Sequence, residues 1–161
     1  MATAPSAREP FAPPAAISVG HVTATDIGLL LIRVIVAAVF IYHGSQKLFG
    51  GIPGFADALA GMGVPSPMLS AILSASTEFF GGVAMLLGFG VRIAAIPMVF
   101  NMLVAAFMVH GKAFSLQHNG MEYALTLGIV LLGLGFTGPG RLSLSWLLSR
   151  KSVQADLDVH R

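Results

Sequence analysis

Residues 27–48 read IGLLLIRVIVAAVFIYHGSQKL, an apolar run interrupted by Arg33 and His43 and ending in polar residues. A helix needs about 20 apolar residues to cross a hydrocarbon layer ~30 Å thick, and this run has that length. Further apolar stretches follow at 67–89, 93–110 and 122–138. A spanning segment must satisfy its own backbone hydrogen bonds, and the alternating polarity of a barrel strand is missing. The sequence therefore predicts an all-α membrane protein with four transmembrane helices.

The composition agrees with a chain surrounded by lipid. Hydrophobic residues make up 55% of the 161 residues and charged residues only 10%, whereas a soluble domain carries about 25% charged residues. The net charge is only +2 and no basic stripe is present, so a nucleic-acid partner is not expected. Cysteine is absent, which excludes disulfides and thiolate metal or iron–sulfur sites in this chain.

The chain divides into three parts. Residues 1–25 are rich in Ala and Pro and read as a disordered leader, residues 26–148 hold the four spans, and residues 150–161 form a polar tail. The loop at 88–91 is a tight reversal, so the second and third spans should be antiparallel neighbours in an up-and-down bundle. A short interfacial helix is expected at about 142–149, because three leucines share one face there and Trp146 suits the headgroup level.

Lysine and arginine counts predict the orientation. With four spans, both termini and loop 88–91 share one side of the membrane. That side carries six basic residues, Arg8, Arg92, Arg141, Arg150, Lys151 and Arg161, whereas the other carries Lys47 and Lys112. Positive residues favour the cytoplasmic side, so both termini are expected in the cytoplasm. The membrane is expected to be the cell membrane, which in a bacterium is the inner membrane.

Two charges lie within the spans. Arg33 is expected about 10 Å from the cytoplasmic end of the first span, and Glu78 about 16 Å from either end of the second. Charges at such depth are costly and are usually paired, so we expect an Arg33–Glu78 ion pair, with Asn101 in the same polar layer. Such a pair either fixes helix register or takes part in ligand or proton handling, and the sequence leaves both roles open.

A second polar group is expected at the outer mouth of the bundle, formed by His43, Lys47, His110 and Glu122. These residues either position a small ligand at the membrane interface or are ordinary solvated helix ends. The spacing of the histidines is not a metal-ligand or haem-ligand pattern, so no metal site is predicted.

Four motifs resemble the DoxX family of small membrane proteins. They are LIR at 31–33 leading to HGSQKL at 43–48, TEFFGG at 77–82 with GFGVR at 88–92, NGMEYAL at 119–125, and GPGRLSL at 138–144. The similarity covers roughly residues 26–148. The family pattern often has an acidic residue at the position of Ser145 and an aromatic one at the position of Met121. The resemblance adds Arg141 to the candidate site residues.

The resemblance implies a four-helix protein of the cytoplasmic membrane that is associated with quinone-linked oxidoreductase chemistry. No flavin fingerprint or haem motif is encoded, so a partner protein would supply the electron carrier, and quinone would be the one cofactor bound. The alternative is a non-enzymatic scaffold or a small-molecule permease built as a homo-oligomer, with Arg33, Glu78 and Asn101 as its polar layer. Whether the chain is itself catalytic stays open.

Overall fold

The computed structural model describes residues 21–159, and within this range it contains helices and no strands. The helices are α1 (Ala24–Gly50), α2 (Ile52–Gly61), α3 (Pro67–Leu87), α4 (Val91–Val104), the π-helical segment Ala105–Val109, a 3₁₀ turn (Leu116–His118), α5 (Glu122–Thr137) and α6 (Leu144–Val159). The prediction of an all-α fold is confirmed. Most of the leader expected at 1–25 lies outside the described residues, as do the last two residues of the tail.

Three of the helical runs are long and apolar enough to cross a membrane: α1, α3, and α4 together with its π-helical continuation. The fourth expected span corresponds to α5, which is apolar but has only 16 residues and a length of about 24 Å. Large apolar side chains face outward, with Leu31 63%, Ile93 76% and Phe136 78% exposed. A surface of this kind is unfavourable in water and is suited to hydrocarbon.

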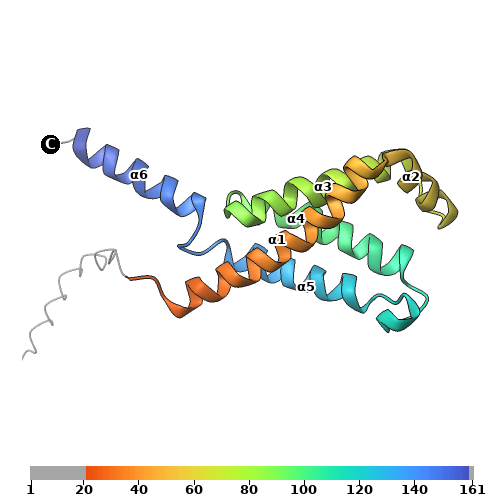
Figure 1. The fold of residues 1–161 in the computed structure, drawn as a ribbon. Helices are drawn as coiled ribbons and strands as arrows, with labels where there is room; N and C mark the ends of the chain where they lie inside the picture. Colours follow the sequence, from red (N-terminus) through yellow and green to blue (C-terminus); the bar gives the residue numbers. More distant parts are fainter. Residues whose placement is uncertain (1–20, 160–161) are drawn as a thin grey trace, which may run out of the picture.

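The helices form a bundle in which α1 packs along α3, α3 contacts α4, and α4 packs along α5 (Figure 1). The predicted tight reversal at 88–91 makes α3 and α4 neighbours: Gly88 closes α3 in the left-handed conformation, and Gly90 opens α4 at φ +61°. At the end where α1 begins, α6 leaves the bundle, whereas α2 and the 110–121 segment lie at the opposite end (Figure 1).

Helix α1 crosses α3 at very short range. Gly44 lies so close that a Cβ built on it would stand 2.4 Å from the backbone nitrogen of Phe79. One turn further along α3, a Cβ on Gly82 would stand 2.9 Å from the backbone nitrogen of Ile41. Small residues at a crossing let two backbones approach, which is the usual means of packing helices in lipid.

The structure differs from the sequence prediction in three places: the first connecting segment, the end of the third span and the C-terminal helix. The segment 49–66, which was expected to be a loop, contains helix α2, and Pro53 in its first turn is favourable there. The third span does not stay α-helical, because residues 105–109 widen into a π-helix closed by the hydrogen bond from His110 N to Ala105 O. Helix α6 runs from Leu144 to Val159, well beyond the interfacial helix expected at about 142–149.

The α1–α3 crossing can be tested by adding one methyl group. Gly44→Ala should lower the free energy of unfolding by about 1–3 kcal/mol, because the new Cβ meets backbone that cannot move alone. Gly28→Ala is the matched control on the same helix. No atom lies within 4 Å of its Cβ position, so it should be neutral or stabilising by up to about 1 kcal/mol. Unfolding by SDS titration, followed by circular dichroism, measures both, and equal stability of the two variants would contradict the crossing.

Candidate functional site

The predicted Arg33–Glu78 ion pair is wrong. Arg33 is 1% exposed, and its guanidinium donates only to backbone carbonyl oxygens. Nε donates to Met85 O (2.9 Å), and the terminal nitrogens donate to the carbonyls of Leu86 (3.4 Å), Leu142 (3.2 Å) and Pro139. The guanidinium therefore ties α1 to the last turn of α3 and to the segment that links α5 to α6.

The register of α1 on α3 explains why Arg33 does not reach Glu78. The backbones meet at Gly44 and Phe79, and Arg33 lies 11 residues, about 16 Å, from Gly44 along α1. The helices are antiparallel, so moving toward Arg33 on α1 means moving toward the carboxyl end of α3. Arg33 therefore comes level with Met85 and Leu86, whose carbonyl oxygens belong to the final turn of the helix and lack the usual amide partner four residues further on. Basic side chains commonly bond such carbonyls.

The 138–144 motif packs around this arginine. A Cβ on Gly88 would stand 2.8 Å from the guanidinium carbon of Arg33 and 2.6 Å from Cβ of Ser143, so this contact requires a glycine. The buried carboxylate of Asp26 accepts from the backbone N–H of Arg141 at 2.9 Å, and it also caps α1 through Thr23. The Arg141 side chain donates to His21 O at 3.2 Å. Arg33, Asp26 and Arg141 thus hold chain segments together at the end of the bundle where α1 begins.

Glu78 pairs with a residue that was expected at the outer mouth. Lys47 Nζ lies 2.5 Å from Glu78 Oε1 and 2.6 Å from Oε2, and Asn101 Nδ2 donates to Oε1 at 3.0 Å. The glutamate is 3% exposed, so this carboxylate is buried with two donors from two other helices. We call Lys47, Glu78 and Asn101 the polar triad. Asn101 therefore shares a layer with Glu78 as expected, but Arg33 does not.

The α1–α3 crossing places the triad. Lys47 lies one turn beyond Gly44, and Glu78 is adjacent to Phe79, so the close approach of the two backbones brings ammonium and carboxylate into contact. Helix α2 folds over the lysine, with Nζ 4.9 Å from the ring centroid of Phe55, which is a cation–π geometry. This role of α2 was not predicted from the sequence, in which the available signal is the aromatic Phe55 that follows Ile-Pro-Gly.

Two cavities flank the triad. A larger one of about 520 Å³ lies between α2, α3 and α4, and a smaller one of about 190 Å³ lies between α1, α4 and α5. Both are lined by the same four residues, Lys47, Glu78, Ala105 and His110. The ion pair and the π-helical segment therefore form the wall that the cavities share. Such π-helical turns frequently occur at functional sites.

The remaining predicted residues lie around the smaller cavity or in the adjoining loop. His43 and His110 line the smaller cavity, and His110 Nδ1 is 3.0 Å from Asn119 O. Glu122 lines neither cavity, because its carboxylate accepts from the backbone N–H of Leu116 and so caps the 3₁₀ turn. Among residues 21–159 no three His, Asp or Glu side chains are grouped as metal ligands would be.

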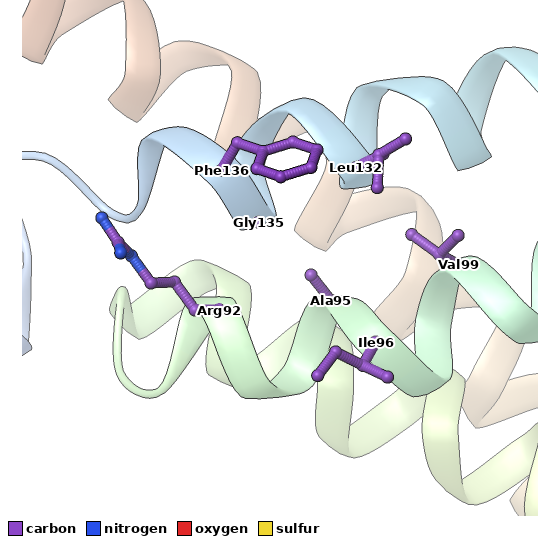
Figure 2. Close-up of a pocket in the computed structure, with 7 residues that line it drawn as sticks. All are labelled: Arg92, Ala95, Ile96, Val99, Leu132, Gly135 and Phe136. Carbon is purple, nitrogen blue, oxygen red and sulfur yellow. The ribbon is translucent and has the colours of Figure 1, made fainter.

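A further groove of about 320 Å³ lies between α4 and α5 (Figure 2), and no residue of the triad lines it. It is lined by Ala95, Ile96, Val99, Leu132, Gly135 and Phe136, with the guanidinium of Arg92 at one end (Figure 2). The groove is almost wholly apolar and offers a ligand one charged group. The cavities beside the triad differ from this groove because several polar groups converge in them, as a binding site requires.

The DoxX family model matches residues 28–111, which include Arg33 and the whole polar triad. The chain belongs to the DoxX family. It is 34% identical to "Inner membrane protein YqjF" of Escherichia coli over 128 residues, which cover 78% of this chain and 95% of that protein. It is 34% identical over 119 residues to "Putative oxidoreductase CatD" of Bacillus subtilis, covering 74% and 85% of the two chains. No solved structure matches the chain.

A DoxX relative, "Inner membrane protein YphA" of Escherichia coli, is 31% identical over 127 residues, covering 75% of this chain and 90% of that protein. These alignments are longer than the family match and extend over most of the relatives' own length. The chain therefore matches nearly the full length of each of these three relatives.

Replacing Arg33 with lysine tests the contacts between its guanidinium and the backbone carbonyls. Arg33→Lys should lower the free energy of unfolding by about 3 kcal/mol, because one ammonium cannot reach the carbonyls that the planar guanidinium contacts from three nitrogens. Arg92→Lys is the matched control at the same end of the bundle. Arg92 is exposed, so that variant should stay within about 0.5 kcal/mol of the parent. SDS unfolding compares the two, and a harmless Arg33→Lys would refute the structural role.

Removing one partner tests the triad. Lys47→Met should cost about 3 kcal/mol, because it leaves a buried carboxylate with Asn101 as its remaining donor. The double variant Lys47→Met, Glu78→Gln should recover part of that loss, since no charge is then left buried. Lys112→Met, an exposed lysine of the following loop, is the control and should be neutral. A double variant no more stable than Lys47→Met would show that the pair is not the source of the loss.

Proposed function

We propose that this DoxX protein is a membrane subunit that binds a quinone for a partner oxidoreductase. The observation that carries the proposal is the polar triad at the wall of the larger cavity. A quinone head group is an apolar ring with two carbonyl oxygens, and it needs an apolar pocket with a few fixed hydrogen-bond donors. The cavity offers apolar walls from Leu59, Val64, Leu73 and Val104, with the Lys47 ammonium and the Asn101 amide at one side.

The position of the cavity supports the proposal. Leu73 and Phe100 line it and are 57% and 67% exposed, so its rim lies on the face of α3 and α4 that would contact lipid. A quinone dissolved in the bilayer would reach the cavity without crossing water. The larger cavity, at about 520 Å³, is within the usual size range of small-molecule sites.

The redox partner is part of the proposal. The chain has no cysteine and its sequence contains no flavin or haem motif, so an electron carrier would come from another protein. The relative CatD bears a name that places it, provisionally, among oxidoreductases, which agrees with this proposal.

In the alternative as a permease, Arg33, Glu78 and Asn101 form one polar layer. That layer is not formed, because Arg33 lies at the far end of α3.

We further propose that the protein lies in a bacterial inner membrane with both termini in the cytoplasm. The relatives YqjF and YphA are named as inner membrane proteins. The count of lysine and arginine supports this orientation, with six such residues on the terminal side and Lys47 and Lys112 on the opposite side.

A tryptophan in the cavity wall would report quinone binding. In a Trp146→Phe background, which removes the native indole, Phe100→Trp places a fluorophore at the larger cavity. Ubiquinone-1 added to the protein in nanodiscs should quench it with saturation. Phe107→Trp is the control, because Phe107 is 60% exposed and lines neither cavity. There the quenching should rise linearly, as expected for quinone that only partitions into lipid.

The same assay tests the polar contact. Adding Asn101→Leu to Phe100→Trp should weaken binding about tenfold, because one hydrogen bond is worth about 1–1.5 kcal/mol. Linear, unsaturable quenching at both tryptophan positions would refute the quinone site.

A further inference from the structure

The two cavities differ in the surface that each one faces. The larger cavity has its rim among exposed apolar residues of α3 and α4, as described above. The smaller cavity carries the polar side chains His43, His110 and Tyr123 beside Lys47 and Glu78. His43 and Tyr123 are exposed and lie at the end of the bundle formed by the 110–123 segment, so the cavity reaches the surface there.

The smaller cavity has the size and the groups to hold water. Its volume of about 190 Å³ leaves room for several molecules at the ~30 Å³ that a water occupies in the liquid. A buried water needs two to four polar partners, and the histidine, tyrosine, lysine and glutamate side chains supply them. The larger cavity has such groups at the wall that both cavities share, at the adjoining amide of Asn101 and at its Ser and Thr side chains, and its remaining lining is apolar apart from these.

Toward the other end of the bundle the triad is closed off by a layer of apolar side chains. Phe40, Met85, Met98 and Leu131 are each no more than 2% exposed, and they belong to one core cluster. Met85 lies seven residues, about 10 Å, beyond Glu78 on α3. Beyond that layer lies Arg33, whose guanidinium is already bonded to backbone carbonyls. No polar group of the described residues bridges the gap.

We propose that the smaller cavity is a water-filled path that connects Glu78 and Lys47 to the aqueous surface at the 110–123 end, and to that end alone. This deepens the proposed function, since it gives the quinone site a one-sided supply of protons. A proton is transferred from a ligand hydroxyl to a Glu78 carboxylate oxygen and from there to water in the cavity. The same transfers can run in the opposite direction. The step is acid–base only: one O–H bond breaks as another forms, and the electrons leave through the partner protein.

The groups that face this path come from four elements. Lys47 and His43 belong to α1, Glu78 to α3, His110 directly follows the π-helical segment, and Tyr123 belongs to α5. His110 lines both cavities, so it is placed to accept a proton from either side of the ion pair. The remaining lining residues, such as Val39, Met102 and Leu127, are apolar and keep the path narrow.

The absence of native cysteine makes the path directly testable by thiol labelling. Ala124→Cys places a thiol in the smaller cavity, and Leu127→Cys places a second one in the same wall one turn along α5. Leu131→Cys is the control on the same helix, because Leu131 is fully buried and lines neither cavity. Thr77→Cys reports on the larger cavity. Lys112→Cys, at an exposed loop position, marks the membrane side of the 110–123 end.

A charged methanethiosulfonate reagent is applied to sealed vesicles of both orientations. Ala124→Cys or Leu127→Cys should react at least ten times faster than Leu131→Cys and Thr77→Cys. The reaction should occur only in vesicles of the orientation in which the reagent also labels Lys112→Cys. Lipid-soluble N-ethylmaleimide should label Thr77→Cys in both orientations. Labelling of the smaller cavity at the Leu131→Cys rate, or from the side opposite Lys112→Cys, would overturn the proposal. No quinone is used, so this outcome is independent of the fluorescence test.

Discussion

The close crossing of α1 and α3 at Gly44 and Gly82 is the constraint on which both polar centres depend. In lipid there is no hydrophobic drive between helices, so the two backbones stay together through van der Waals contact and polar links. The crossing fixes the register, and the register then decides which side chains meet. One turn beyond the crossing Lys47 contacts Glu78, and three turns before it Arg33 donates to carbonyls at the carboxyl end of α3.

Buried Arg33 and half-buried Lys47 have different kinds of partner, and the difference separates structure from chemistry. Arg33 has no carboxylate partner, but its five hydrogen bonds to carbonyl oxygens join α1, α3 and the 138–142 segment. A guanidinium keeps all its protons at physiological pH, so Arg33 cannot act as a proton donor or acceptor for a ligand. Lys47 and Glu78 both can lose or gain a proton, and both line cavities. The motifs around Arg33 are therefore assembly contacts, and those around Glu78 form the proposed site.

Hydropathy was sufficient to predict the helical bundle, the reversal at 88–91 and the burial of Glu78, because each depends on local composition. The ion pair was assigned to the wrong cation because depth was counted from the ends of apolar runs. Helix α1 begins at Ala24 and ends at Gly50, past both ends of its apolar run, and its register on α3 is set by two glycines rather than by the membrane. Lys47 was placed at the surface for the same reason. The π-helical turn left no periodic signal, since it follows from tertiary packing. Helix α2 did leave one, because its apolar residues at 52, 55, 56 and 59 have helical spacing and form the face that it buries.

The position of the Lys47–Glu78 pair is itself an argument for function. A buried ion pair is seldom more stable than apolar residues of the same volume, because removing two charges from water costs about as much as their attraction returns. A helix crossing already fixed by Gly44 and Gly82 does not need the pair to set its register. The pair also stands where packing is incomplete, between two cavities and beside a π-helical turn. A pair that served packing alone would be expected in a filled interior, whereas one that meets a ligand and water would be found at such a wall.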